Sequence, residues 1–308
     1  MPVGTWEIAI SVLADHQARD PKREPVRADR QGCEEAPPEP HRYVLVTVRY
    51  LEFLRRFHEV LEPPTYLEIG IRRGDSLALA SCARIGIDPA YQVRKKLELE
   101  SALFQETSDE YFDRPEPLAP FGGRPAALSF IDGMHLVEFA LRDFVNVERC
   151  SDWTSAVVFD DIFPADAEMA ARNRETIAWT GDVYKVVAIL DRHRPDLIRL
   201  RVDTEPTGLL LVLGLDPQNT VLEQRLDEIV LEAVRPDPQR VPQEVIDRLG
   251  ALDPEKVLEA PFWSWLREAR DRGVPRQGGI RELRRRIRRD LGIGVRLPLG
   301  AALSRLRA

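Results

Sequence analysis

Three aspartates and one histidine stand directly after two short apolar runs of the sequence. Asp132 and His135 follow the first run, and Asp160 and Asp161 follow the second. If the two runs are neighbouring parallel strands, their carboxyl ends meet at one edge of a sheet, where open α/β sheets bind ligands. Three carboxylates suit a hard dication such as Mg²⁺. His135 lies one helical turn beyond Asp132, so it can face the same cavity and act as a general base.

These features also have ordinary structural explanations. Aspartate pairs after strands often cap helices, and a single histidine is more often a solvated or capping residue than a base. In a functional site, a metal and a second cation nearby would favour the neutral form of His135, which is the form that accepts a proton. The residues therefore predict a metal-and-base constellation and leave the capping alternative open.

A glycine-containing turn supplies the second pattern with chemical meaning. Glu68, Gly70 and Gly74 follow the spacing Glu-x-Gly-x-x-x-Gly at the end of a predicted strand. Glycines at such a turn let the backbone approach a ligand where a Cβ would collide, and a helix opening at Ser76 would offer unpaired N–H groups. Asp88 ends the next predicted strand, where a carboxylate can accept hydrogen bonds from both ribose hydroxyls.

The spacing of this turn differs from the Gly-x-Gly-x-x-Gly of dinucleotide sites and disfavours that class of ligand. The alternative is that both glycines only permit the turn and that Asp88 caps a loop. Because the two motifs occur together and in order, a nucleotide site is the favoured interpretation.

The elements that would position these residues alternate between short apolar runs and helical stretches. This alternation is typical of a mostly parallel sheet with helices on both faces. The last two runs are separated by only five residues, too few for a crossover helix, so they should pair as an antiparallel hairpin. The predicted fold class is therefore α/β, with seven strands: five parallel strands plus a terminal antiparallel hairpin. The predicted strands are Thr65–Ile69, Arg84–Asp88, Leu97–Phe104, Ala127–Asp132, Ser155–Asp160, Leu197–Val202 and Gly208–Gly214. The predicted helices between them are Ser76–Ala83, Leu136–Asn146, Ala165–Thr176 and Asp182–Arg192.

Further segments flank this central domain, which is predicted over residues 43–217. Residues 1–42 are rich in Pro, Arg, Asp and Glu and predict a loose arm. Tyr43–Leu61 has helical spacing and predicts an amphipathic helix ahead of the first strand. Residues 218–308 predict a helical extension, with helices at Thr220–Ala233 and Gly279–Leu291.

The composition limits the class of protein. Apolar residues make up 44% and charged residues 31%, as in ordinary soluble globular proteins. No apolar run is long enough to cross a bilayer, and the N-terminus lacks the basic flank of a secretory signal. The three cysteines form neither a CxxC pair nor a disulfide-like spacing, which favours a reducing cytoplasm. Only five of the 44 basic residues are lysine, which indicates a GC-rich bacterial genome.

Charge is unevenly distributed along the chain. The net charge is −7, yet from Arg267 onward thirteen arginines stand against four acidic residues. The body is therefore acidic, and no nucleic-acid partner is expected. The predicted helix Gly279–Leu291 carries an apolar stripe among arginines. Such a helix suits peripheral contact with an anionic membrane or an acidic partner, and equally suits packing onto the acidic body or dimerisation into a homo-oligomer.

Three segments also carry a family resemblance. Tyr66–Ser76, Ile85–Pro89 and Phe130–His135 resemble the class I S-adenosylmethionine-dependent methyltransferases of the family 24 type. Those enzymes are related to catechol O-methyltransferase and to sugar O-methyltransferases. The resemblance spans about residues 43–217. It implies a Rossmann-like methyltransferase sheet and S-adenosylmethionine as the cofactor.

The resemblance also implies which residues contact the cofactor. The cofactor-binding residues that it predicts are Glu68, Gly70, Gly74, Ser76, Asp88, Ser108, Asp109 and Asp132. The turn residues would line the methionine and ribose end, and Asp88 would hold the ribose. Ser108 and Asp109, expected in the loop after the third strand, would lie near the adenine.

The related metal-dependent O-methyltransferases have an acid after the fourth strand and an Asp-Asp or Asp-Asn pair after the fifth. Here the pair follows Asp132 by 28 and 29 residues, a separation that those enzymes share. The resemblance thus implies Asp132, Asp160 and Asp161 as metal ligands and a base at the position of His135. Catechol-type enzymes have a lysine at that position, so histidine is a departure.

Together these features predict a methyltransferase that acts on oxygen. The predicted reaction is S-adenosylmethionine-dependent and Mg²⁺-assisted, with a hydroxyl of a sugar or polyhydroxylated small molecule as acceptor. The substrate class follows from the resemblance alone. One alternative is a metal-independent methyltransferase with His135 as the base. Another is a non-catalytic scaffold that binds the cofactor or a glycan while its arginine-rich tail contacts a membrane or another protein.

Overall fold

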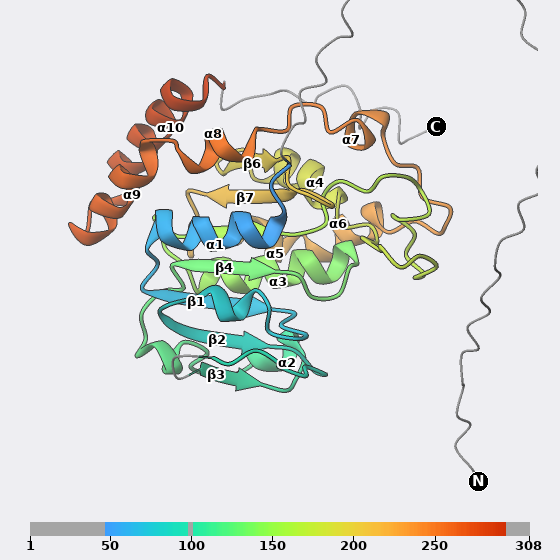
Figure 1. Cartoon of the computed structure of the whole chain (residues 1–308), viewed down its shortest axis with the longest axis horizontal. Helices are drawn as coiled ribbons and strands as arrows, with labels where there is room; N and C mark the ends of the chain where they lie inside the picture. Colours follow the sequence, from blue (N-terminus) through green and yellow to red (C-terminus); the bar gives the residue numbers. More distant parts are fainter. Residues whose placement is uncertain (1–46, 98–100, 294–308) are drawn as a thin grey trace, which may run out of the picture. The chain divides into compact units, whose positions relative to one another are not determined.

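The computed structural model describes residues 47–97 and 101–293 (Figure 1). Within them, seven strands form one sheet in the order β3-β2-β1-β4-β5-β7-β6. All neighbouring pairs are parallel except those of β7, which runs opposite to both β5 and β6. The strands are β1 (Thr65–Ile69), β2 (Ala83–Ile87), β3 (Ser101–Phe104), β4 (Leu128–Ile131), β5 (Ala156–Phe159), β6 (Ile198–Val202) and β7 (Leu209–Leu213). This sheet confirms the predicted fold class.

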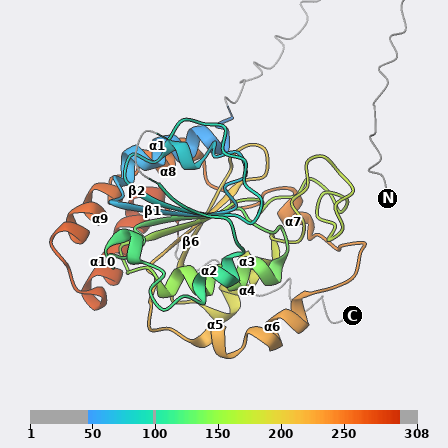
Figure 2. The same ribbon diagram turned by 90° about the horizontal axis from the view of Figure 1, so that it is seen from below.

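Two layers of helices bury the sheet, one on each face (Figure 2). The central strands β1, β4, β5 and β7 are buried at every residue, which explains why they are continuous apolar runs. One face is covered by α1 (Tyr50–Leu61), α8 (Pro254–Leu258), α9 (Phe262–Asp271) and α10 (Arg276–Leu291). The other face packs against α2 (Ser108–Phe112), α3 (Val137–Arg149), α4 (Lys185–His193), α5 (Val221–Gln224) and α6 (Leu226–Ala233), and α7 (Gln243–Ile246) follows.

Three of the predicted helices differ from the structure. Only a 3₁₀ turn, η1 (Leu77–Leu79), replaces the helix predicted over Ser76–Ala83. The connection from β1 to β2 is short, and once the glycine turn has been made there is room for little more than one turn before β2 begins. The segment predicted as the helix Ala165–Thr176 contains no helix at all. The helix predicted over Thr220–Ala233 is broken at Arg225 into α5 and α6.

Smaller differences concern the ends of elements. The first helix begins at Tyr50, and the predicted arm 1–42 lies outside the described residues. A second 3₁₀ turn, η2 (Ala119–Phe121), precedes β4. The described residues belong to one compact unit, in which the extension completes the core beneath α1.

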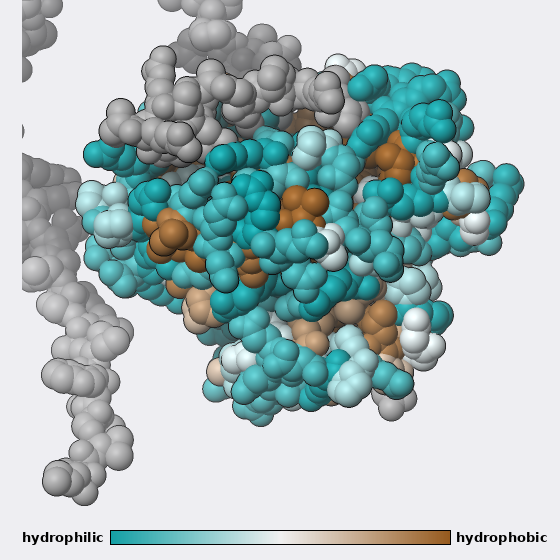
Figure 3. All heavy atoms as spheres, turned by 180° about the vertical axis from the view of Figure 1, so that it is seen from behind, coloured by the Kyte–Doolittle hydropathy of each residue, from teal (hydrophilic) through white to brown (hydrophobic). Residues whose placement is uncertain are grey.

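The apolar stripe of α10 packs onto the body. Leu283 and Ile287 are fully buried, and Gly279 lies so close to Trp153 that a Cβ would come within 2.3 Å of the indole ring. Arg276 and Arg284 also bond to the body, to the carbonyl oxygens of Leu215 and Asp196. Arg281, Arg285, Arg288 and Arg289 are exposed, and contact of this helix with a membrane or an acidic partner stays a prediction. The rear surface is mostly hydrophilic, with small separate apolar patches (Figure 3). None of the helices in the described ranges has both the length and the apolar character needed to cross a membrane.

One buried histidine in the core makes stability depend on pH. His58 in α1 is 6% exposed and packs edge-on against Tyr66, with ring centroids 4.7 Å apart. Neither nitrogen of its ring has a hydrogen-bond partner among the described residues. Burial, together with the nearby Arg84, lowers the pKa of His58 to about 4 from 6.5. The unfolded chain therefore binds the proton more readily, and stability from the neutral ring is present above pH 6.5 and lost as pH falls toward 4.

Between roughly pH 7.5 and roughly pH 5 we expect this loss to amount to about 2 kcal/mol of unfolding free energy. A His58→Phe variant should keep the ring contact and lose that part of the pH dependence in urea unfolding measured at roughly pH 7.5 and roughly pH 5. His193→Phe is the control, because that histidine lies half-buried at the end of α4, outside the core. Equal pH slopes for wild type and His58→Phe would contradict the assignment.

Candidate active site

The glycine turn after β1 is joined to the ends of two neighbouring strands. The amide of Gly70 donates to the carbonyl of Ile87 over 2.8 Å, and the amide of Asp132 donates to the carbonyl of Ile69 over 2.9 Å. Gly70 has φ +91°, and a Cβ there would lie 1.9 Å from the carbonyl oxygen of Asp132. Only glycine satisfies both the backbone conformation and this contact. Gly74 also has a positive φ, of +78°, as a tight turn requires.

Glu68 lies beneath this turn and is hydrogen-bonded to Ser76 at its end. Its carboxyl group is fully buried and accepts hydrogen bonds from the Tyr66 hydroxyl at 2.8 Å and the Ser76 hydroxyl at 2.5 Å. Burial raises the pKa of Glu68 to about 8, against the lowering effect of these two hydrogen bonds. The predicted cofactor residues Glu68 and Ser76 therefore contact each other beneath the turn, and direct contact with a cofactor stays a prediction.

Asp88 lies at the end of β2, beside the glycine turn. One carboxylate oxygen accepts from the amide of Arg72 at 2.8 Å and the other from the amide of Ala90 at 2.7 Å. The residue thus caps a loop, as the structural alternative expected. Each carboxylate oxygen retains a second lone pair, so the group can still accept hydrogen bonds from ribose hydroxyls. The chemistry of this residue fits an S-adenosyl cofactor.

The two residues predicted near the adenine lie in the first turn of α2 rather than in a loop. Thr107 and Glu110 form a capping box there, which fixes the start of the helix. Ser108 donates to Asp143 over 2.5 Å, and Asp109 pairs with Arg142 at 2.9 Å. Burial raises the pKa of Asp143 to about 7. Asp143 also lies next to Gly133, so α2 borders the end of β4.

The structure brings Asp132, His135 and Asp161 together at the carboxyl ends of β4 and β5. One ligand atom from each lies within 4.8 Å of the others. His135 stands between the carboxylates, with Nε2 3.4 Å from Asp132 and Nδ1 2.9 Å from Asp161. Asp161 has φ +62°, which turns the backbone at the end of β5 and directs its side chain to the cluster. The capping alternative does not describe this arrangement.

Asp160, the third predicted metal ligand, lies beside this cluster rather than within it. Its Oδ1 accepts from the amide of Asp161 at 2.8 Å and from the hydroxyl of Thr207 at 3.3 Å. Burial and the neighbouring carboxylates of Asp161 and Asp132 raise the pKa of Asp160 well above its usual range. A part in binding a metal stays a prediction for this residue.

The electrostatics of His135 differ from the sequence-based expectation of a neutral ring. Burial lowers its pKa, but the hydrogen bonds and charges of Asp132 and Asp161 outweigh this effect and raise the pKa of His135 to about 11. A dication suits the same two carboxylates, because they supply hard oxygen donors that converge on one point. Positive charge at that point would oppose the rise in the pKa of the imidazole.

Three further residues lie at this site that the sequence patterns do not indicate. The Trp179 ring stacks on His135 at 5.0 Å between centroids. Thr207, between β6 and β7, donates to Asp160. Tyr50 begins α1, and its pKa is raised by burial and by the carboxylates of the cluster. No spacing pattern in the sequence links Tyr50 to that cluster.

No family model and no curated protein matches the sequence, so the relationship to the family 24 methyltransferases stays a prediction. Among solved structures, a putative O-methyltransferase from Klebsiella pneumoniae is similar with 16% identity, 54% of this chain and 80% of that chain covered, and a TM-score of 0.42. The O-methyltransferase TomG from Streptomyces achromogenes, in complex with S-adenosylmethionine, has 18% identity, 54% and 79% coverage, and a TM-score of 0.39. An O-methyltransferase from Bacillus cereus in complex with S-adenosylhomocysteine has 12% identity, 53% and 80% coverage, and a TM-score of 0.40. Because these similarities are weak, the function is inferred from the chain's own site.

Proposed function

We propose that the protein is an S-adenosylmethionine-dependent O-methyltransferase, assisted by a dication such as Mg²⁺. The acceptor would be a hydroxyl of a sugar or polyhydroxylated small molecule. The observation that carries the proposal is the contact between Gly70 and the backbone of Asp132. It joins the turn suited to a nucleoside to the cluster suited to proton transfer, so a methyl donor on the turn would lie beside that cluster.

Each residue of the cluster would have a different chemical role. His135 Nδ1 lies 2.8 Å from the carbonyl oxygen of Trp179. A carbonyl only accepts, so Nδ1 carries a proton there. In the neutral ring that a bound dication would favour, Nε2 is the nitrogen that can take the proton of an acceptor hydroxyl. Asp132 and Asp161 would hold the dication, and the ring of Trp179 keeps the imidazole in one orientation.

A bound S-adenosylmethionine would supply an electrophilic methyl group, and a dication would acidify the acceptor hydroxyl. Transfer of that methyl group from sulfur to the acceptor oxygen would leave S-adenosylhomocysteine, and His135 Nε2 would take the hydroxyl proton. The chain itself contributes mainly by positioning the two reacting atoms in line, since oriented reactants account for much of such a rate acceleration.

The reaction is tested by incubating the protein with S-adenosylmethionine and a panel of sugars and polyols, and by measuring S-adenosylhomocysteine. We expect product with at least one acceptor, a loss of at least about tenfold with a chelator, and recovery with Mg²⁺. Turnover that the chelator leaves unchanged would favour the metal-independent alternative. Cofactor binding without product from any acceptor would favour the non-catalytic scaffold.

The ribose contact gives a second test. Asp88→Ala should weaken S-adenosylhomocysteine binding in calorimetry by about 10- to 100-fold, because hydrogen bonds to a charged group are worth about 1.5–3 kcal/mol. Asp113→Ala, at an exposed aspartate that follows α2, is the matched control and should bind as the wild type does. Equal affinity for all three proteins would remove Asp88 from the site.

A further inference from the structure

The segment between β5 and α4, residues 160–184, holds His135 in place. Besides the stacked ring and the carbonyl contact of Trp179, Gly181 lies directly against the histidine backbone. A Cβ on Gly181 would be 1.7 Å from the carbonyl oxygen of His135. The orientation of the imidazole therefore depends on where residues 179–181 lie.

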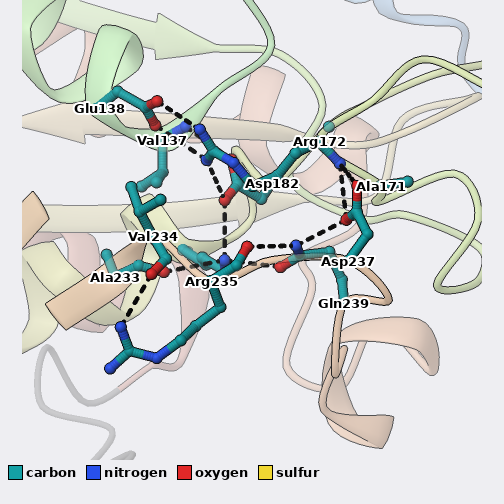
Figure 4. Close-up of polar contacts among 12 residues, drawn as sticks. Val137, Glu138, Ala171, Arg172, Asp182, Ala233, Val234, Arg235, Asp237 and Gln239 are labelled. Atoms are coloured by element: carbon teal, nitrogen blue, oxygen red, sulfur yellow. Dashed lines mark hydrogen bonds and ion pairs between the residues drawn. The ribbon is translucent and has the colours of Figure 1, made fainter. Parts of the chain in front are cut away.

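This segment contains neither helix nor strand, and buried charges fix it instead. Arg172 donates to Asp182 at 2.8 Å and to Glu138 of α3 at 3.0 Å. Asp182 is fully buried and also accepts from the first amide of α3, Val137, at 2.9 Å and from Lys185 at 2.8 Å (Figure 4). Removing one member of such a buried network leaves the others without compensation, so the network specifies one arrangement of the segment.

The helical extension supplies the other side of this network. The Asp237 carboxylate accepts from the backbone amide of Arg172 at 3.0 Å (Figure 4). It also accepts from the backbone amide of Asn173 at 3.2 Å. Gln239 donates to Asp237 at 2.9 Å and accepts from Lys185 at 2.8 Å. Asp237 and Gln239, about 100 residues beyond His135 in the sequence, thus hold the middle of the segment that contacts this histidine.

We propose that Asp237 is a positioning residue for His135, through which the extension keeps the base oriented. Asp237 fixes the backbone at Arg172, the Arg172 guanidinium fixes Asp182, and the neighbouring Gly181 and Trp179 fix the imidazole. The part of His135 in catalysis rests on the proposed function, whereas the mechanical coupling does not.

The coupling is tested in the full chain with Asp237→Ala and the milder Asp237→Asn, which keeps one acceptor oxygen. Asp247→Ala is the control, because this exposed aspartate of the same extension accepts from Gln243 at 2.9 Å and does not belong to the network. The readouts are acrylamide quenching of Trp179 fluorescence, taken as the difference from matching Trp179→Phe proteins, and the ¹⁵N signals of the His135 ring, assigned with His135→Gln.

We expect Asp237→Ala to raise quenching of Trp179 at least about twofold and to shift the His135 signals, with Asp237→Asn intermediate and Asp247→Ala unchanged. Turnover should fall about tenfold while the affinity for S-adenosylhomocysteine stays the same, as expected for a loss of orientation. If Asp237→Ala does not fold, the Asn variant decides. Unmoved Trp179 and His135 signals in a folded variant would overturn the proposal. Signals that move in a protein without methyl transfer would instead refute the proposed function and leave the coupling intact.

Discussion

A Gly70→Ala variant is expected to lose S-adenosylhomocysteine binding by at least about 100-fold and to be less stable by about 3 kcal/mol. The added methyl group would stand 1.9 Å from the carbonyl oxygen of Asp132, and the residue has φ +91°. Because the obstacle is backbone, no side-chain rotation can relieve the clash, so the ends of β1 and β4 must separate. Calorimetry with S-adenosylhomocysteine and urea unfolding measure the two effects.

The matched control for this change is Gly122→Ala. Gly122 also has a positive φ, of +64°, but a Cβ there meets nothing within 4 Å. It should therefore show only the backbone strain, about 1–2 kcal/mol of unfolding free energy, with unchanged cofactor affinity. Wild-type affinity in Gly70→Ala would show that the contact between the turn and Asp132 does not shape the cofactor site.

A His135→Gln variant is expected to lose about 10²- to 10⁴-fold in kcat while binding S-adenosylhomocysteine as tightly as the wild type. Glutamine can still donate to the Trp179 carbonyl, but it cannot take up the acceptor's proton. The rate of S-adenosylhomocysteine formation, with the polyol that the wild type uses best, measures the loss.

The control for this variant is His193→Gln in the last turn of α4, where the imidazole contacts Arg225 at the surface. This protein should keep the wild-type rate. Full activity in His135→Gln would exclude the base role and would leave His135 as a counter-charge for Asp132 and Asp161.

The sheet and its functional edge could be predicted because strands buried on both faces consist of consecutive apolar residues, which are visible in the sequence. Asp132 and Asp161 lie together at the carboxyl ends of β4 and β5, as predicted from their positions after two apolar runs. The departure of Asp160 was not predictable, since it depends on the positive φ of Asp161 and on the hydroxyl of Thr207. No periodic pattern reports such local turns.

The segment after β5 shows why an amino-acid composition that favours helix does not by itself predict a helix. Residues 165–176 contain several alanines and glutamates, which favour helix. Arg172, however, is bound to Glu138, Asp182 and, through its amide, Asp237. These tertiary contacts with distant residues outweigh the local preference. For the same reason, the stacking of Trp179 on His135 could not be inferred from the spacing of either residue.

Crystals soaked with S-adenosylhomocysteine and Mn²⁺ would test the central claim most directly. We predict electron density for the nucleoside along the Gly70–Gly74 turn, with the ribose hydroxyls at Asp88, and an anomalous peak between Asp132 and Asp161. A nucleoside bound elsewhere, or no density at the turn at saturating ligand, would contradict the assignment of this protein as an S-adenosylmethionine-dependent methyltransferase.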